Sequence, residues 1–197
     1  MKTFIFGLII GLLIPAIVGY CYFRYGYAPV ATASAPMPFE KTMARMALRA
    51  RISKEAPKNV PLQPTEQNLT EGAKIYVQNC AFCHGWPNQP ATVAAKGMFP
   101  LPPQLFSKDE MVTDDPVGVT WWKVKNGIRM TGMPGFGEMV PDNQIWQVSL
   151  LLHEADKLPA SAQNALTRMS PMPPAQTENN TPAPEKSPAP PAQGKKK

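Results

Sequence analysis

The stretch Cys80-Ala81-Phe82-Cys83-His84 decides how this chain is interpreted. Two cysteines separated by two residues and followed directly by histidine form the pattern to which a haem is covalently attached. Each cysteine sulfur forms a thioether with the porphyrin, and the histidine imidazole binds the iron from one side. The sequence therefore predicts one covalently bound haem c, held by Cys80, Cys83 and His84, with His84 as the proximal iron ligand.

Two other chemistries use a pair of cysteines with this spacing. A structural zinc site needs a second pair of ligands, but the third cysteine of the chain, Cys21, lies in an apolar stretch. A thioredoxin-like redox pair occurs near a βαβ pattern, and no such pattern surrounds Cys80. The haem interpretation is therefore preferred.

The charge of the chain is unevenly distributed. Its 197 residues have a formal net charge of +6, but the excess of bases lies in residues 41–58 and at the C-terminal end. Residues 62–160 contain more acids than bases. A nucleic-acid-binding domain would carry its basic residues on the folded part, together with aromatic side chains, so we expect no nucleic-acid partner.

The N-terminal segment is long and apolar. Residues 3–23 contain no charged side chain, and Arg24 ends the run. A helix needs about 20 apolar residues to cross a membrane, whereas the apolar part of a signal peptide has about 7–15. Aromatic residues gather at the outer end, as expected at a membrane–water boundary: Tyr20, Tyr22, Phe23, Tyr25 and Tyr27.

These features predict an uncleaved transmembrane anchor over residues 1–27, in the cytoplasmic membrane. A signal peptide that is removed is the alternative. Because a c-type haem is attached outside the cytoplasmic membrane, the haem domain is expected on the periplasmic, outer face.

Residues 28–64 are predicted to be a spacer followed by a basic connector helix. Residues 29–38 are rich in Pro and Ala and suggest an extended spacer, whereas residues 39–55 contain no Gly or Pro. One face of the predicted helix is apolar: Phe39, Met43, Met46, Ala47 and Ala50. Two interpretations stay open: residues 41–58 contact anionic lipid, or the helix is a solvated connector packed against the haem domain or a partner subunit.

Residues 65–159 are predicted to be the haem domain, and the fold class is all-α. We expect one helix from a cap at Asn68 or Thr70 to Asn79, one over residues 116–126 and one over residues 143–155. Residues 85–108 contain many Pro and Gly residues and predict a loop. Residues 160–197 are rich in Pro, Ala and Lys without any aromatic residue, and predict a disordered tail.

A second iron ligand is sought among the methionines and histidines after the motif. Met133 is favoured because Gly132 and Pro134 flank it in a glycine-rich loop, and a weak thioether ligand must be held in place by its loop. Met130 is the rival, whereas His153 lies within the last predicted helix. We therefore expect His84 and Met133 to bind the iron.

With these motifs, residues 69–158 resemble the class I cytochrome c domain, close to the small bacterial monohaem type. The resemblance implies that Gly72 and Tyr76 pack against the last helix, where Leu150 or Leu151 replaces the usual aromatic. It also implies that the Pro103 carbonyl, in Pro103-Gln104-Leu105, accepts a hydrogen bond from the proximal imidazole.

Three further side chains are expected beside the haem crevice, Trp121, Trp122 and Phe136, with ordinary core packing as the alternative. Arg129 is expected to pair with a haem propionate, its alternative being a solvated surface residue.

Ligation by His and Met leaves no open iron position, so the expected function is electron transfer, not catalysis. The chain is predicted to carry single electrons between redox partners of the respiratory chain, as a tethered shuttle or as a subunit of an oxidase or reductase complex. The first alternative is a haem enzyme, or a gas or peroxide sensor, with a labile sixth ligand. The second is a structural subunit whose basic helix and tail recruit partners.

Overall fold

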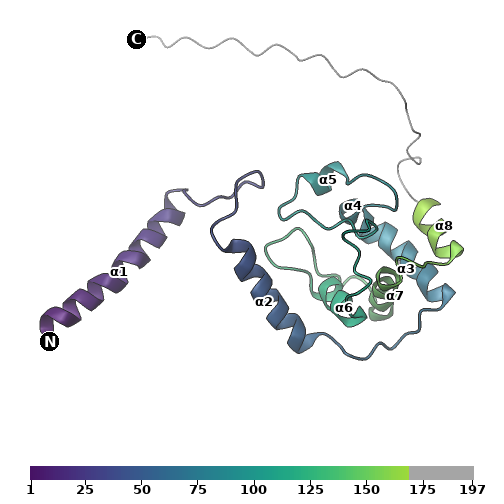
Figure 1. Cartoon of the computed structure of the whole chain (residues 1–197), viewed down its shortest axis with the longest axis horizontal. Coiled ribbons are helices and arrows are strands. Elements are labelled where there is room, and N and C mark those ends of the chain that lie inside the picture. The colour runs from purple at the N-terminus through teal and green to yellow at the C-terminus, as the bar shows by residue number, and fades with distance from the viewer. Residues whose placement is uncertain (169–197) are drawn as a thin grey trace, which may run out of the picture.

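The computed structural model describes residues 1–168, and within this range every regular element is an α-helix (Figure 1). This confirms the all-α prediction. The predicted tail lies outside the described residues from 169 onward. The helices are α1 (Lys2–Arg24), α2 (Glu40–Glu55), α3 (Glu66–Asn79), α4 (Ala81–His84), α5 (Val93–Lys96), α6 (Val117–Asn126), α7 (Asp142–His153) and α8 (Ala160–Arg168).

The core of the molecule is the crossing of α3 and α7, against which α6 and α8 pack (Figure 1). Apolar side chains on α3 and α7 recur at helical spacing, so each helix presents one apolar face to the other. The largest side chains with almost no exposed surface lie at this crossing and under α8: Tyr76, Ile145, Val148, Leu151 and Leu166.

Gly72 sets how closely α3 and α7 approach. A Cβ atom at this position would lie 2.3 Å from the Gln147 carbonyl oxygen and 3.2 Å from the Leu151 Cβ. One turn later, Tyr76 packs edge-on against Phe106, with ring centroids 5.0 Å apart. The resemblance implied the close packing of Gly72 against the last helix, and Leu151 is the residue of α7 that meets it. Packing of Tyr76 against α7 stays a prediction, since the ring contact of Tyr76 is with Phe106.

We predict that Gly72→Ala destabilises the domain. The added methyl group meets a backbone carbonyl that cannot rotate away, and overpacking of this kind costs about 1–3 kcal/mol. The free energy of unfolding, measured by denaturant titration with circular dichroism, is expected to fall. Gly97→Ala is the control, because a Cβ there meets nothing closer than 3.6 Å. Equal stability of the two variants would contradict the packing described here.

Helix α3 begins earlier than the sequence predicted. The cap is Thr65, whose hydroxyl accepts a hydrogen bond from the backbone N–H of Asn68 at 3.3 Å. The Asn68 side chain instead links the start of α3 to the preceding segment and to α7. It donates to the Gln63 carbonyl and accepts from the Gln147 side chain. The predicted caps at Asn68 and Thr70 are therefore wrong.

The predicted loop 85–108 contains the short helix α5. Thr92 caps it by accepting a hydrogen bond from the Ala95 N–H at 3.1 Å, and the same hydroxyl donates to the Phe82 carbonyl at 2.7 Å. One threonine thus ties this segment to the haem-attachment motif.

The predicted disordered tail over residues 160–197 is wrong for its first nine residues, which form α8. Ala162 and Leu166, four residues apart, are buried against α3, and Ser161 donates a hydrogen bond to Glu66 at 2.8 Å. The average composition of residues 160–197 did not reveal this pair of apolar residues. The packed part of the haem domain therefore extends to Arg168.

Leu166→Ala is predicted to destabilise the domain by about 2–5 kcal/mol, since the side chain is only 1% exposed and its loss leaves a cavity. The exposed Asn164→Ala is the matched control on the same helix and is expected to change stability by less than about 0.5 kcal/mol. Thermal unfolding of both variants checks this. A Leu166 variant as stable as the control would mean that α8 does not pack in solution.

Helix α1 has no buried residue within the described part of the chain. It is long and apolar enough to cross a membrane, with a mean hydropathy of 2.4 over its most apolar window. Its length and composition therefore make it a candidate membrane span near the N-terminus.

Candidate functional site

The motif Cys80 to His84 forms a single helical turn that follows α3 without a break. Cys80 ends α3 and begins α4, and its carbonyl oxygen accepts hydrogen bonds from the N–H groups of Cys83 at 3.1 Å and His84 at 2.9 Å. Residues three and four apart on a helix share one face. Cys80, Cys83 and His84 consequently line the same cavity.

The His84 imidazole is oriented by one hydrogen bond to the backbone. Its Nδ1 lies 2.8 Å from the carbonyl oxygen of Pro103. A carbonyl can only accept, so Nδ1 carries the proton and Nε2 keeps the lone pair. The nitrogen available to a metal is therefore Nε2, and the bond fixes both the tautomer and the ring orientation.

A short clamp holds the Pro103 carbonyl against the motif. The Gln104 side chain donates to the Cys83 carbonyl at 3.2 Å and to the Pro102 carbonyl at 3.1 Å, and Leu105 N–H donates to the His84 carbonyl at 3.2 Å. The Gln104 backbone N–H donates to the Glu110 carboxylate. Side chain and backbone of this segment thus both fasten it to the proximal turn.

Met133 reaches the same cavity from the loop that follows α6. The helix ends at Gly127, with a φ of 67°, and a Cβ there would lie 2.5 Å from the Gly135 nitrogen. The loop closes on itself, because Ile128 N–H donates to the Met133 carbonyl at 3.2 Å. The Thr131 hydroxyl donates to Ile128 O at 2.7 Å and accepts from Met133 N–H at 3.1 Å.

The end of this loop is fastened back onto α6. Phe136 N–H donates to the Val124 carbonyl and Gly137 N–H to the Lys125 carbonyl, both at 3.0 Å. Met133 therefore sits on a loop whose two ends converge on the last turn of α6. The position of a weakly binding thioether is set by this hydrogen-bond network.

Other predicted residues are placed differently. Met130, with a φ of 61°, is 90% exposed, and Arg129 is exposed as well. Neither belongs to the cavity lining described for residues 1–168, so the role of Arg129 at a propionate stays a prediction. His153 accepts or donates through Nδ1 at 3.1 Å from the Asp115 carbonyl oxygen, away from the cavity lining.

The aromatic residues expected at the crevice divide between two environments. Phe136 lines the cavity. Trp121 instead stacks on Trp146, with ring centroids 5.0 Å apart, and the Trp122 indole donates to Glu55 of α2 at 3.1 Å. Ordinary packing therefore accounts for the two tryptophans.

The structure also brings a residue that sequence analysis did not favour into the cavity. Met98 lines it, and the Met98 Cε would lie 2.1 Å from a Cβ atom placed on Gly132. Any side chain at Gly132 would therefore displace the flexible end of Met98, beside Met133. The sequence signal was weak, since Met98 lies in a segment with neither periodicity nor a stiffening proline directly after it.

Burial affects the ionisable groups of the site. Burial, and to a lesser extent the neighbouring Cys83, raises the pKa of the Cys80 thiol to about 12. Burial lowers the pKa of His84, and the hydrogen bond to Pro103 opposes part of this shift. A lowered pKa keeps the imidazole neutral at pH 7, and neutral imidazole is the form that binds metal.

The cavity between His84 and Met133 suits a flat apolar cofactor with a metal at its centre. Its walls are mainly apolar, one side offers two thiols and an oriented imidazole, and a thioether comes from the other segment. The cavity volume is about 150 Å³, and the Met98 side chain forms part of its wall. Apolar wall residues are Leu105, Val124, Ile128, Phe136 and Leu152.

We predict that Gln104→Leu weakens the proximal side of the site. The variant loses the side-chain bonds to the Cys83 and Pro102 carbonyls, and unpaired carbonyls of this kind cost about 1–3 kcal/mol. Guanidinium unfolding followed at the haem absorbance is expected to show this loss. The exposed Gln67→Leu is the matched control, expected to lie within about 0.5 kcal/mol of the parent chain. If the two variants unfold alike, Gln104 does not hold the clamp.

Comparison with known proteins gives one match. Residues 67–150 match the family described as cytochrome C oxidase, cbb3-type, subunit III. No curated protein and no solved structure matches the chain. The matched range begins in α3 and ends in α7, and so contains the attachment motif, the Pro103 clamp and the Met133 loop. This part of the chain is a cytochrome c domain, similar to that of the cbb3-type subunit III family.

Proposed function

We propose that this protein is a membrane-anchored c-type cytochrome that carries single electrons between components of a respiratory chain. Cys80 and Cys83 would hold one haem c by thioether bonds, with His84 and Met133 as axial ligands. The observation that carries the proposal is the convergence of an oriented imidazole and a thioether, from α4 and from the loop after α6, on one apolar cavity.

The proposed division is an anchor over residues 1–27, a spacer and connector over 28–64, and a haem domain that extends from residue 65 to Arg168. The anchor would lie in the cytoplasmic membrane with the haem domain on the periplasmic, outer face. The apolar, unburied helix α1 supports the anchor. Contact of the basic segment 41–58 with anionic lipid belongs to the same proposal.

A haem iron supplies reversible one-electron chemistry at this site. The residues of this chain would set its conditions. The Pro103 carbonyl would increase electron density on the His84 ring, the apolar walls would exclude water, and Met133 would fill the place where a substrate could otherwise bind. If His84 and Met133 both hold the iron, the domain would serve as an electron carrier or as a subunit of an oxidase or reductase complex.

The first test is the optical spectrum of the purified protein with a Met133→Ala variant. The ferric protein is expected to show the weak sulfur-to-iron band near the red end of the visible range, and the variant is expected to lose it. Met130→Ala, at a 90% exposed position, and Met98→Ala, at the cavity wall, are the controls and are expected to retain it.

Two results would overturn this assignment. Loss of the band in Met98→Ala, with the band retained in Met133→Ala, would assign the sulfur ligand to Met98 instead of Met133. A ferric protein without the band, whose ferrous form binds carbon monoxide readily, would have an open iron position. The haem enzyme or gas sensor would then replace the electron carrier.

A further inference from the structure

Helix α2 is attached to the haem domain along one face. Ile52 is only 8% exposed, and Glu55 accepts a hydrogen bond from the Trp122 indole of α6 at 3.1 Å. Just after the helix, Pro57 lies against Gly118, where a Cβ atom would be 1.9 Å from the Pro57 carbonyl oxygen. At the other end, the Lys41 ammonium lies 5.8 Å from the Phe99 ring centroid. The helix therefore touches the domain near both of its ends.

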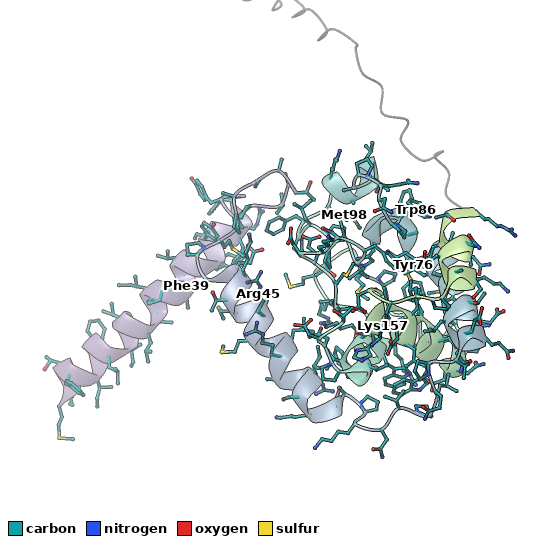
Figure 2. All side chains as sticks on the ribbon, turned by 45° about the vertical axis from the view of Figure 1, so that its right-hand side comes forward. Phe39, Arg45, Tyr76, Trp86, Met98 and Lys157 are labelled. Atoms are coloured by element: carbon teal, nitrogen blue, oxygen red, sulfur yellow. The ribbon has the colours of Figure 1, made fainter. Side chains whose placement is uncertain are left out.

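The opposite face of α2 is apolar and exposed. Phe39, Met43 and Met46 are 77%, 62% and 65% exposed, and Ala47 and Ala50 continue the same face at helical spacing. Ile52 lies on the other side of the helix from this stripe. In Figure 2 the side chains of α2 on the side away from the haem domain extend into open space. We call residues Phe39, Met43, Met46, Ala47 and Ala50 the outer face.

The charge beside the outer face is positive. Both acids of α2 already have partners, since Glu40 accepts from the Met37 N–H at 2.8 Å and Glu55 pairs with Arg51 at 2.7 Å. Arg49 and Lys54, which flank the outer face, form no ion pair with any other side chain of residues 1–168. An apolar stripe bordered by unpaired cations is complementary to an anionic membrane, in which apolar acyl chains lie beneath negatively charged headgroups.

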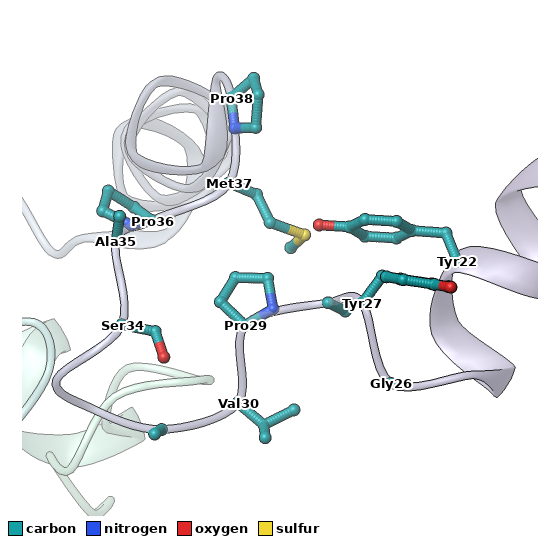
Figure 3. A pocket seen from close by; sticks show the side chains of 12 residues that line it. Tyr22, Gly26, Tyr27, Pro29, Val30, Ser34, Ala35, Pro36, Met37 and Pro38 are labelled. Carbon is teal, nitrogen blue, oxygen red and sulfur yellow. The ribbon is translucent and has the colours of Figure 1, made fainter.

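The start of α2 lies beside the outer end of α1. Tyr22 and Gly26 from the end of α1 line one pocket of about 530 Å³ together with Pro36 and Met37, which directly precede α2 (Figure 3). The connector therefore folds back on itself. Since aromatic residues at the end of a span mark the headgroup level, α2 begins at that level.

The direction of α2 agrees with this placement. In both Figure 1 and Figure 2, α2 runs across the direction of α1 and lies between α1 and the haem domain. A helix that crosses the direction of a membrane span lies along the membrane plane.

We propose that α2 is an interfacial helix whose outer face lies in an anionic phospholipid surface while its other face carries the haem domain. This inference rests on the proposed membrane anchoring of α1 and deepens it. The side chains of Phe39, Met43 and Met46 reach the boundary of headgroups and acyl chains, and Arg49 and Lys54 bind lipid phosphates. The haem domain is thereby held at one height and orientation above the membrane.

The test measures thiol accessibility in the full-length, haem-loaded chain, with Cys21→Ser as background. Single cysteines replace Met46 on the outer face, Ala44, which is exposed but off that face, and Val93, which is 89% exposed in the haem domain. Each chain is reconstituted into nanodiscs of phosphatidylcholine alone or with phosphatidylglycerol. The rate of reaction with a membrane-impermeant maleimide is measured.

In anionic nanodiscs the Met46→Cys thiol is expected to react about tenfold more slowly than the Val93→Cys thiol, because an apolar environment raises a thiol pKa by a unit or more. Ala44→Cys is expected to react almost as fast as Val93→Cys. Arg49→Glu together with Lys54→Glu is expected to abolish the protection of position 46. The matched reversal of two domain cations, Lys74→Glu with Lys96→Glu, is expected to leave it intact.

Three outcomes would overturn the inference. The first is equal reaction rates at positions 46 and 93 in anionic nanodiscs. The second is protection of position 46 in native membranes, assayed in the same way, but not in anionic nanodiscs, which would identify a protein partner as the occupant. The third is failure of the chain to enter nanodiscs at all, which would also remove the proposed anchor. The haem spectrum is measured on the same samples, so the electron-carrier proposal is judged separately.

Discussion

The close crossing of α3 and α7 at Gly72 is the contact on which the site depends. It fixes the end of α3, and α4 continues from that end through Cys80 with no intervening loop. The direction in which Cys80, Cys83 and His84 point is therefore set by helix packing at Gly72, eight to twelve residues earlier. Tyr76 reinforces this link, because its hydroxyl donates to the Gly85 carbonyl at 2.8 Å, directly behind His84.

The two sides of the cavity differ in how they are held. The proximal side is attached to a helix and is fastened by the Pro103 and Gln104 hydrogen bonds. The Met133 side is a loop that depends on the last turn of α6, through Val124 and Lys125. Since a thioether is a weak ligand, the protein structure, and not bond strength, would have to hold Met133 in place as the proposed second ligand.

Several features were predictable from sequence because few residues determine them. The attachment motif needs only Cys80, Cys83 and His84 at fixed spacing, and the helix over residues 116–126 ends at Gly127 because that position needs a positive φ. What the sequence did not reveal depends on long-range contacts. Leu166 is buried only because α3 offers a surface to it, and Met98 enters the cavity only because the 85–108 segment folds over the haem motif.

The connector helix α2 is a second case in which the sequence did not reveal a long-range contact. Its helical period predicted one apolar face, and the two interpretations assigned that helix either to lipid or to the haem domain. In the structure Ile52, on the opposite side, makes the contact with the domain, so the two interpretations no longer exclude each other. A single apolar position on the opposite side of the helix from the main stripe is easily overlooked in a periodic pattern.

The attachment of α2 also bears on the difference between a tethered shuttle and a fixed subunit. If residues 25–64 were a flexible tether, the domain could move far from the end of α1, because extended chain spans about 3.4 Å per residue. Because α2 contacts the domain at Lys41 and again from Ile52 to Pro57, only residues 25–39 remain as a tether, and these fold back so that Tyr22 and Met37 line one pocket. If α1 is the membrane anchor proposed above, this geometry favours a cytochrome domain held at a constant height over one that moves freely on a long tether.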